Sequence, residues 1–386
     1  MRHLVRVAAF ACLLAAAAVA HAQSTPDEQA LAAKAREFSR LYAAKSYDAA
    51  AQAADETIAL ARKMNRADVV GGMLYNKACL AAVTGHSAEA IALAQAAVEA
   101  GYTDYYMFAS DADFASIRGS REFTALLADL RKKNAVAPHD WDPTRSTGPF
   151  SITFDDPSLP ALVELRREFD IDRAVSGAHD DYARLLLLTS WVSKQWQHSP
   201  TGMASKADPT TILREAKAGG HFICRDYAIV LAGAARAYGM PARVLNLLPR
   251  DVETRSEAHS VAEVWVASRT KWVLADGQYG IVAEVAGVPA NGVELQRALA
   301  SDDARVTCAV GGDACSAWKP FVLRNGYYFK TAQDQRRYDG KRGPQLVLVP
   351  KGAPDPHKFA GGNEEVFAGA VYISDPKVFY TPPMQQ

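Results

Sequence analysis

Three short pieces of sequence decide how this chain folds. They are GGHFICRDYA (219–228), AHSVAEVW (258–265) and KWVLADG (271–277). Read in order, they supply Cys224, then His259, then Asp276. The patterns around these residues predict that each lies at the start of a helix or on a β-strand. We therefore expect the rest of the chain to support a site that contains these three side chains.

The first piece predicts a thiol at the start of a helix. Residues 224–238 are rich in Ala and are followed by Gly239, a typical helix stop. An upstream helix begins at Asp208-Pro209 and ends at Gly219-Gly220. Cys224 then lies where a loop enters a helix, and the free N–H groups there can lower a thiol pKa from about 8.5 by one or more units. The same N–H groups could stabilise an oxyanion.

The second and third pieces predict a β-hairpin. Residues 259–266 and 271–276 are both strand-like. If the turn centres near residues 267–268, His259 and Asp276 lie opposite each other, with Cβ atoms about 5 Å apart. The carboxylate could then hold the imidazole, which would deprotonate the thiol and later protonate a leaving amine.

The order and the flanking residues resemble the transglutaminase-like superfamily, which includes transglutaminases, bacterial cysteine proteases and peptide:N-glycanases. The resemblance covers roughly residues 180–285. It rests on Cys224 with Asp-Tyr-Ala after it, Gly-Met-Pro-Ala-Arg243-Val, His259 with Glu263-Val-Trp265, and Trp272 before Asp276. It implies an α+β fold with a papain-like core, in which the cysteine helix packs on an antiparallel sheet that carries the histidine and the aspartate. It also implies that Cys224, His259 and Asp276 are catalytic. We expect Glu263 and Trp265 to be core or orienting residues.

Two other readings of these residues stay open. The first is a binding module without catalysis, which is favoured by Phe222, because many members of the superfamily have glycine two residues before the cysteine. The second is a metal site in which His221 and Cys224 are joined by His198 or His259. No second close pair of ligands accompanies His221-x-x-Cys224, so we expect neither a metal nor another cofactor.

A polar side chain upstream of the cysteine often completes an oxyanion hole in thiol hydrolases. Residues 182–197 predict a helix, and the candidates at and beyond its end are Gln195, Trp196 and His198. The sequence does not choose among the three, and helix packing is an equally simple role for Trp196.

The first 22 residues predict a secretory signal peptide. Arg2, His3 and Arg6 precede an apolar run, and Ala20-His21-Ala22 is a small-x-small cleavage site. We expect a mature protein that begins near Gln23 and is exported, either periplasmic or secreted, with an uncleaved anchor as the alternative. No later run is long and apolar enough to span a membrane.

The charge of the chain is balanced. It has 43 basic and 43 acidic residues, and loss of residues 1–22, with Arg2 and Arg6, leaves 41 basic and 43 acidic. This balance gives no reason to expect nucleic acid or an anionic membrane as a partner.

Residues 23–133 predict an N-terminal α-helical repeat domain. Its Ala-rich helices are expected at 27–43, 47–63, 67–84 and 87–100, with a degenerate third unit at 111–127. The arrangement resembles tetratricopeptide repeats, although its offset of 40 residues exceeds the usual repeat of about 34. Such stacks bind peptides or proteins, so a protein partner is one expectation and a plain helical spacer is the other.

Residues 134–150 contain three prolines without periodicity and predict a linker to a second domain at 151–386. There we expect a short helix within 282–300 and strands at 321–330, 345–350 and 366–374. Cys308 and Cys315 flank a flexible turn, so an exported chain should join them by a disulfide. Cys79 is expected to be buried within a helix.

Taken together, these patterns predict an exported thiol enzyme. It would act on amide bonds of protein or peptide substrates through a thioester on Cys224. Hydrolysis is favoured over acyl transfer, because water is the commonest acceptor.

Overall fold

The computed structural model describes residues 25–133, 136–146, 150, 152–199, 202–255, 257–338, 343–360 and 364–383, without the side chains of residues 364 and 365. The predicted signal peptide, residues 1–22, lies outside the described residues. The chain divides into two compact units, Met1–Ala135 and Val136–Gln386.

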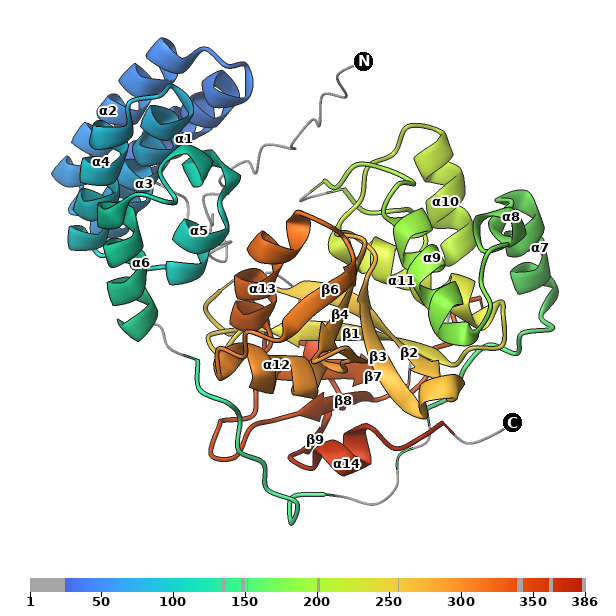
Figure 1. The fold of residues 1–386 in the computed structure, drawn as a ribbon. Coiled ribbons are helices and arrows are strands. Elements are labelled where there is room, and N and C mark those ends of the chain that lie inside the picture. Colours follow the sequence, from blue (N-terminus) through green and yellow to red (C-terminus); the bar gives the residue numbers. More distant parts are fainter. Residues whose placement is uncertain are drawn as a thin grey trace. The chain divides into compact units, whose positions relative to one another are not determined.

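The first unit is helical. Its helices are α1 (Pro26–Ala43), α2 (Tyr47–Lys63), α3 (Ala67–Val83), α4 (Ser87–Glu99), α5 (Tyr105–Ser110), the 3₁₀ helix η1 (Ala112–Ser116) and α6 (Arg121–Lys133). Consecutive helices from α1 to α4 pack against one another, in agreement with the predicted helical repeats (Figure 1). Ala50 and Ala90 occupy equivalent places in α2 and α4 and are fully buried, so that the small side chains allow close packing. Cys79 is buried within α3, as predicted.

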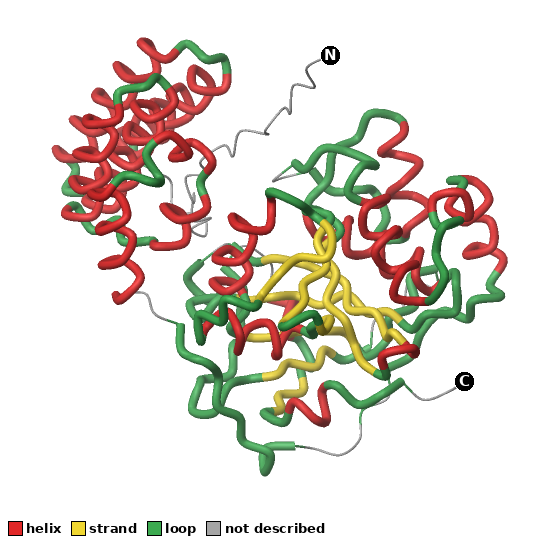
Figure 2. The backbone as a smooth tube through the Cα atoms, viewed as in Figure 1, coloured by secondary structure: helices red, strands yellow, loops and turns green. Residues whose placement is uncertain are grey.

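The second unit is built on a nine-stranded sheet that is antiparallel except for the pairing of β8 with β9. The order is β5-β4-β3-β2-β1-β7-β8-β9, and β6 pairs with β4. The strands are β1 (Ala242–Leu248), β2 (His259–Val266), β3 (Lys271–Asp276), β4 (Ile281–Val285), β5 (Val288–Pro289), β6 (Val306–Val310), β7 (Tyr328–Ala332), β8 (Gln345–Leu348) and β9 (Val371–Ile373). Figure 2 shows this sheet as the yellow centre of the unit.

Helices cover both faces of the sheet. They are α7 (Pro160–Glu168), α8 (Ile171–Ala174), α9 (Asp181–Val192), α10 (Pro209–Lys217), α11 (Cys224–Arg236), α12 (Gly292–Ala300), α13 (Ala314–Asn325) and α14 (Pro376–Phe379), with 3₁₀ helices η2 (Ala267–Arg269) and η3 (Glu364–Phe367). Helices α7 to α11 share one apolar core with Val244, Ala262 and Val273 of the sheet. Helices α12 to α14 share another with Leu245 and Val261, whose side chains point to the opposite face.

Helix α11 is the central helix of the first core. Every residue from Asp226 to Arg236 is buried, because one side of the helix faces β1 and β2 and another faces α9 and α10. Gly233 makes the second contact close: a Cβ at this position would lie 2.2 Å from Cγ of Pro209, at the start of α10. This packing fixes the direction of α11, and with it the place of Cys224 at its first residue.

The predicted strand at 321–330 is wrong over its first part. The predicted strand 321–330 is helix α13 up to Asn325 and strand only from Tyr328. The helix forms because Trp318 and Val322, four positions apart, are both buried against the sheet. The short helix predicted within 282–300 is α12, which begins at Gly292, and residues 281–285 before it pair with β3 and β6.

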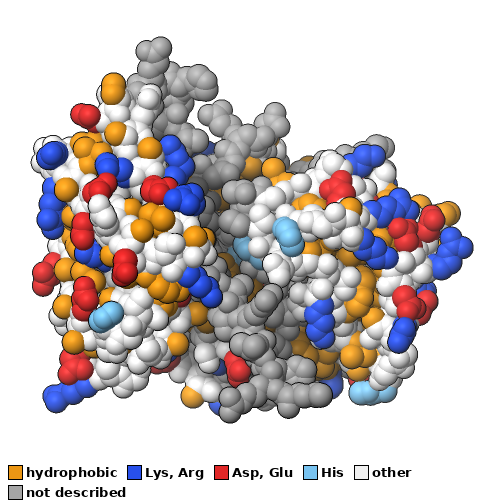
Figure 3. Space-filling view, turned by 90° about the horizontal axis from the view of Figure 1, so that it is seen from above, with side chains coloured by type: hydrophobic (Ala, Val, Ile, Leu, Met, Phe, Trp, Pro, Cys, Tyr) orange, Lys and Arg blue, Asp and Glu red, His pale blue; other side chains and the backbone are white. Residues whose placement is uncertain are grey.

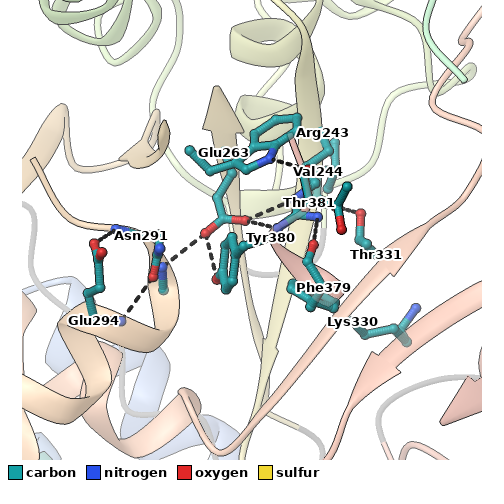
Figure 4. A network of polar contacts seen from close by, with 12 residues as sticks. Arg243, Val244, Glu263, Asn291, Glu294, Lys330, Thr331, Phe379, Tyr380 and Thr381 are labelled. Atoms are coloured by element: carbon teal, nitrogen blue, oxygen red, sulfur yellow. Dashed lines mark hydrogen bonds and ion pairs between the residues drawn. The ribbon is translucent and has the colours of Figure 1, made fainter. Parts of the chain in front are cut away.

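A buried ion pair ties the end of the chain to the sheet. Arg243 of β1 donates to Oε2 of Glu263 of β2 through Nε (2.9 Å) and through one terminal nitrogen (2.7 Å), and neither side chain is exposed. The same guanidinium donates to the carbonyl of Phe379, and Glu263 accepts from the Tyr380 hydroxyl and from the Gly292 N–H (Figure 4). The prediction that Glu263 is a core or orienting residue agrees with this arrangement.

On the face seen in Figure 3, Lys and Arg side chains are interspersed with Asp and Glu side chains. Among the helices of the described residues, none has both the length and the apolar character needed to cross a membrane.

Candidate active site

Cys224 is the first residue of α11, as the sequence predicts. The residue before it, Ile223, has extended backbone angles and caps the helix without a side-chain hydrogen bond. The N–H groups of the first turn therefore lie beside a thiol that is partly exposed. This is the environment in which a thiolate is favoured.

A neighbouring loop supports the segment that leads into Cys224. Ser199 donates its backbone N–H to the carbonyl of Phe222, and Ile223 donates to the carbonyl of Gly202. The approach is so close that a Cβ on Gly202 would lie 1.9 Å from the carbonyl oxygen of His221. Glycine is required at this position because any side chain would force the two segments apart.

His259 and Asp276 are in contact on the face of the sheet that α13 covers. Nε2 of His259 lies 2.7 Å from Oδ2 of Asp276, and both side chains are almost completely buried. The predicted register is wrong by two positions, because β2 pairs with β3 through Ala262 and Ala275. The turn is η2 followed by Thr270 and centres beyond residues 267–268. A slip of two keeps both residues on the same face, so the imidazole reaches the carboxylate diagonally.

Four hydrogen bonds fix the Asp276 carboxylate. Oδ1 accepts from the backbone N–H groups of Gln278 (3.0 Å) and Tyr279 (3.2 Å). Oδ2 accepts from the indole Nε1–H of Trp318 (2.7 Å) in addition to His259. The carboxylate is thus held by its own turn and by a helix from elsewhere in the chain.

The imidazole of His259 also lies close enough to the Cys224 thiol for each group to shift the pKa of the other. Because Nε2 faces Asp276, Nδ1 is the nitrogen left for the sulfur. Burial alone would raise the pKa of the Cys224 thiol. His259 and the backbone N–H of Ser260 lower this pKa by more than burial raises it, so the net shift is downward. Burial alone would lower the pKa of His259, but the charge and hydrogen bond of Asp276 raise it, with help from Cys224, to about 10. Both shifts favour a thiolate–imidazolium pair.

Two aromatic rings lie against the imidazole. The ring of Phe321 is 4.9 Å from that of His259, centroid to centroid, and the ring of Tyr279 is 6.0 Å away. The sequence reading missed Phe321 and Trp318, because their stretch was assigned in part to a strand. The signal that could have found them is their spacing of three residues, which is helical.

The structure distinguishes the three candidates for an oxyanion donor. The Gln195 amide donates to the carbonyl of Trp191 (2.8 Å), four residues earlier in the chain. His198 lies near the site, because its pKa is lowered by the partial burial of its ring and then by the charge of His259. The indole Nε1–H of Trp196 is buried and has no hydrogen-bond partner among the described residues.

Trp196 is connected to α11 through Tyr227. The Tyr227 hydroxyl donates to the carbonyl of Trp196 (2.8 Å), and the two rings lie 4.1 Å apart. Phe222 also packs against Trp196, with ring centroids 5.7 Å apart, and is buried. The residue that differs from the superfamily pattern is therefore part of the core beside the site, and Cys224 still faces His259.

The alternative metal site is not assembled. Within the described residues, the group whose ligand atoms all lie within 4.8 Å of one another is Cys79, Asp111 and Asp113, in the helical unit. It includes neither His221 nor Cys224.

The predicted disulfide is present between Cys308 of β6 and Cys315 of α13. It joins the first turn of α13 to the strand that pairs with β4. The disulfide therefore links the sheet covalently to the helix that carries Trp318.

Comparisons with known proteins concern the part of the chain that carries these residues. No curated protein matches the sequence. A solved structure that matches comes from Cytophaga hutchinsonii, and its protein is provisionally named a cysteine protease. The two sequences are 16% identical over 38% of this chain and 46% of that chain, less than half its length, with a TM-score of 0.26. Residues 170–277, which include Cys224, His259 and Asp276, match the family model described as the transglutaminase-like superfamily. This chain therefore carries a transglutaminase-like domain, which follows an N-terminal helical region.

Proposed function

We propose that this protein is a thiol enzyme that breaks amide bonds of proteins or peptides through a thioester on Cys224, with water as the favoured acceptor. The observation that carries the proposal is the placement of His259 between the Cys224 thiol and the buried Asp276 carboxylate. A nucleophile, a base within reach of it and a third group that orients the base form the arrangement typical of covalent catalysis at a carbonyl.

The residues have the following roles in this mechanism. His259 takes the proton of Cys224, and the thiolate attacks the carbonyl carbon of the amide to form a tetrahedral intermediate. As the C–N bond breaks, the imidazolium gives its proton to the leaving amine, and a thioester remains on Cys224. Water then attacks the thioester with His259 as base, which releases a carboxylic acid and restores the thiol.

The negative oxygen of the intermediate needs hydrogen-bond donors. The N–H groups at the start of α11 are adjacent to the sulfur. Trp196 is the favoured side-chain donor, because its buried indole N–H is unpartnered among the described residues, while the Gln195 amide already donates to the carbonyl of Trp191. His198 stays an alternative.

A non-catalytic binding module is the competing function, and the residue that favours it is Phe222. Burial of Phe222 against Trp196 shows how the loop accommodates a large residue while the thiol keeps its contact with His259. The geometry thus supports an enzyme over a degenerate fold.

The test uses p-nitrophenyl acetate, an activated acyl donor that needs no specific pocket. We expect a burst of nitrophenolate and a mass increase of one acetyl group on the peptide that contains Cys224. Decay of this adduct at the same rate with and without an added alkylamine indicates hydrolysis, whereas formation of the N-acetylated amine indicates transfer. Acetylation of Cys224 no faster than in His259→Ala would contradict the proposal.

Export is part of the proposal. The predicted cleavage after Ala22 and the Cys308–Cys315 disulfide both fit an oxidising compartment outside the cytoplasm. Mass spectrometry of protein from fractionated cells tests this point. The expected N-terminus is Gln23 in the periplasmic or secreted fraction, and a chain that keeps residues 1–22 would contradict it.

A further inference from the structure

One row of side chains on α13 contacts the His–Asp pair and the segments next to it. The row has a member at every third position: Cys315, Trp318, Phe321 and Arg324. Cys315 is bonded to Cys308, and the Trp318 indole donates to Asp276. Each step of three residues turns by about 60° around a helix, so neighbouring members of the row lie on adjoining faces of α13 and the row winds along it.

The other two members of the row reach the histidine and the segment that leads into it. The Phe321 ring lies against the ring of His259. A terminal nitrogen of Arg324 lies 2.8 Å from Oε2 of Glu257, two residues before His259. Both partners of the His–Asp pair therefore depend on the placement of the same helix.

Trp318 differs from the other donors to Asp276. Gln278 and Tyr279 belong to the turn that follows Asp276, and His259 is the group to be oriented. Trp318 is 42 residues away in sequence and fully buried, so its N–H sets the direction of Oδ2 independently of the hairpin.

The disulfide completes a closed path around the carboxylate. Asp276, the last residue of β3, pairs with Ile281 of β4, and Ala283 of β4 pairs with Cys308 of β6. The bond from Cys308 leads to α13, and Trp318 of α13 returns to Asp276. The position of Trp318 relative to Asp276 is thereby constrained by the direct hydrogen bond and by the path through the strands and the disulfide.

We propose that α13 is the positioning helix of this site: Trp318 orients Asp276, and through it His259, and the Cys308–Cys315 disulfide holds Trp318 in place. The proposal rests on the function proposed above. Trp318 does not touch the sulfur or a substrate, so it is a positioning residue. Its effect should appear in the protonation behaviour of the Cys224–His259 pair.

The test compares two substitutions that each remove one buried indole N–H. Trp318→Phe removes the donor to Asp276. Trp272→Phe is the matched control, because its Nε1–H donates to the carbonyl of Thr381 (3.1 Å), away from the pair, and its ring is also buried. The readout is the rate of alkylation of Cys224 by iodoacetamide as a function of pH, followed by peptide mass spectrometry.

We expect Trp318→Phe to move the midpoint of this profile upward by about half a unit to one unit, because a less well oriented Asp276 stabilises the imidazolium, and so the thiolate, less well. Trp272→Phe should leave the midpoint unchanged. In an Asp276→Asn background, Trp318→Phe should have no further effect, because it acts through that carboxylate.

The double variant Cys308→Ser, Cys315→Ser tests the second half of the proposal. It keeps Trp318 but removes its anchor, so the midpoint should move in the same direction. Combined with Trp318→Phe, it should add nothing. If Trp318→Phe does not give the far-ultraviolet circular dichroism spectrum of the folded protein, this double variant decides the proposal alone.

The outcomes separate this inference from the function on which it rests. If Cys224 of the wild-type protein titrates like a thiol of the unfolded chain, the proposed function fails. If the wild-type midpoint is lowered but neither Trp318→Phe nor the double serine variant moves it more than Trp272→Phe does, the role of α13 is refuted and the function stands. A shift that persists in the Asp276→Asn background also refutes it.

Discussion

Nε2 of His259 lies 2.7 Å from Oδ2 of Asp276, although the strand register places the two residues diagonally and not opposite each other. The diagonal placement has a chemical consequence. It directs Nε2 to the carboxylate and leaves Nδ1 for the thiol, so that the two ring nitrogens have separate tasks. A carboxylate that accepts from Nε2–H keeps Nδ1 free to accept the proton of Cys224.

Asp276→Asn should abolish the division of tasks between the two ring nitrogens of His259. The two backbone N–H groups of Gln278 and Tyr279 require an oxygen at the Oδ1 position, so the new amide nitrogen would face His259. The imidazole would then carry its proton on Nδ1, toward the sulfur, which is the wrong tautomer. We expect the rate of acyl transfer from p-nitrophenyl acetate to fall by about two to four orders of magnitude with the fold retained. Undiminished activity would remove Asp276 from the mechanism.

The Cys224–His259 pair should give a characteristic dependence of stability on pH. The pKa of Cys224 is lowered from 9.0 on folding, and that of His259 is raised from 6.5 to about 10. At pH values below about 9 at which the folded thiol and the unfolded imidazole have both lost their protons, the unfolded chain holds one proton on the thiol and the folded pair holds one on the imidazole. The numbers of bound protons are equal, so the contribution of the pair is constant there. Above 9 the unfolded thiol loses its proton first, and the contribution falls until the pH passes about 10.

The measurement for this prediction is the free energy of unfolding in urea at several pH values. The contribution of the pair is the difference between the wild-type protein and Cys224→Ala, His259→Ala. A difference that rises between about pH 9 and 10 would contradict the assigned direction of the His259 shift.

Arg243→Met should destabilise the second unit strongly, because it leaves the Glu263 carboxylate buried without its cation. Removal of one partner from a buried pair costs about 3–5 kcal/mol. The matched control is Arg305→Met, since Arg305 pairs with Asp303 at the surface and is 70% exposed. The control should leave the free energy of unfolding nearly unchanged, because an exposed ion pair contributes little. Equal effects of the two substitutions would contradict the role given to the buried pair.

The Cys308–Cys315 disulfide closes a short loop with a sequence separation of 7. In the chain-entropy model such a loop stabilises the fold by about 2.5 kcal/mol. Urea unfolding of the oxidised protein and of Cys308→Ser, Cys315→Ser measures this difference. Non-reduced peptide mapping of the wild-type protein provides the control, because a link from either cysteine to Cys224 would overturn the assigned pairing.

The sequence alone predicted the parts of the site that are coded locally. The helix start at Cys224 follows from the Gly-Gly stop before it and the Ala-rich run after it, and the hairpin follows from two strand-like runs. The exact pairing of the hairpin depends on the geometry of its turn, which Ala267 to Thr270 form as η2 and a left-handed residue. This geometry is not visible in the composition of the turn, so the register was missed by two.

The role of α13 could not be predicted in the same way. Its residues 321–325 contain Phe and Val, which favour a strand, and Pro320 interrupts a helical pattern. The helix forms because Trp318 and Val322 are buried against the sheet, which is a tertiary effect. Contact between Trp318 and Asp276 joins positions 42 apart, and no local pattern records such a contact.

The central claim is that Cys224 is an activated nucleophile, and the rate at which iodoacetamide alkylates it at about pH 7 tests this most directly. Its lowered pKa and its contact with His259 predict faster labelling of Cys224 in the folded protein than in the urea-unfolded chain, with His259→Ala slower than the wild type. The buried Cys79 should stay unlabelled under the same conditions and serves as the internal control. Labelling of Cys224 in the folded protein at or below the rate in the unfolded chain would contradict the account.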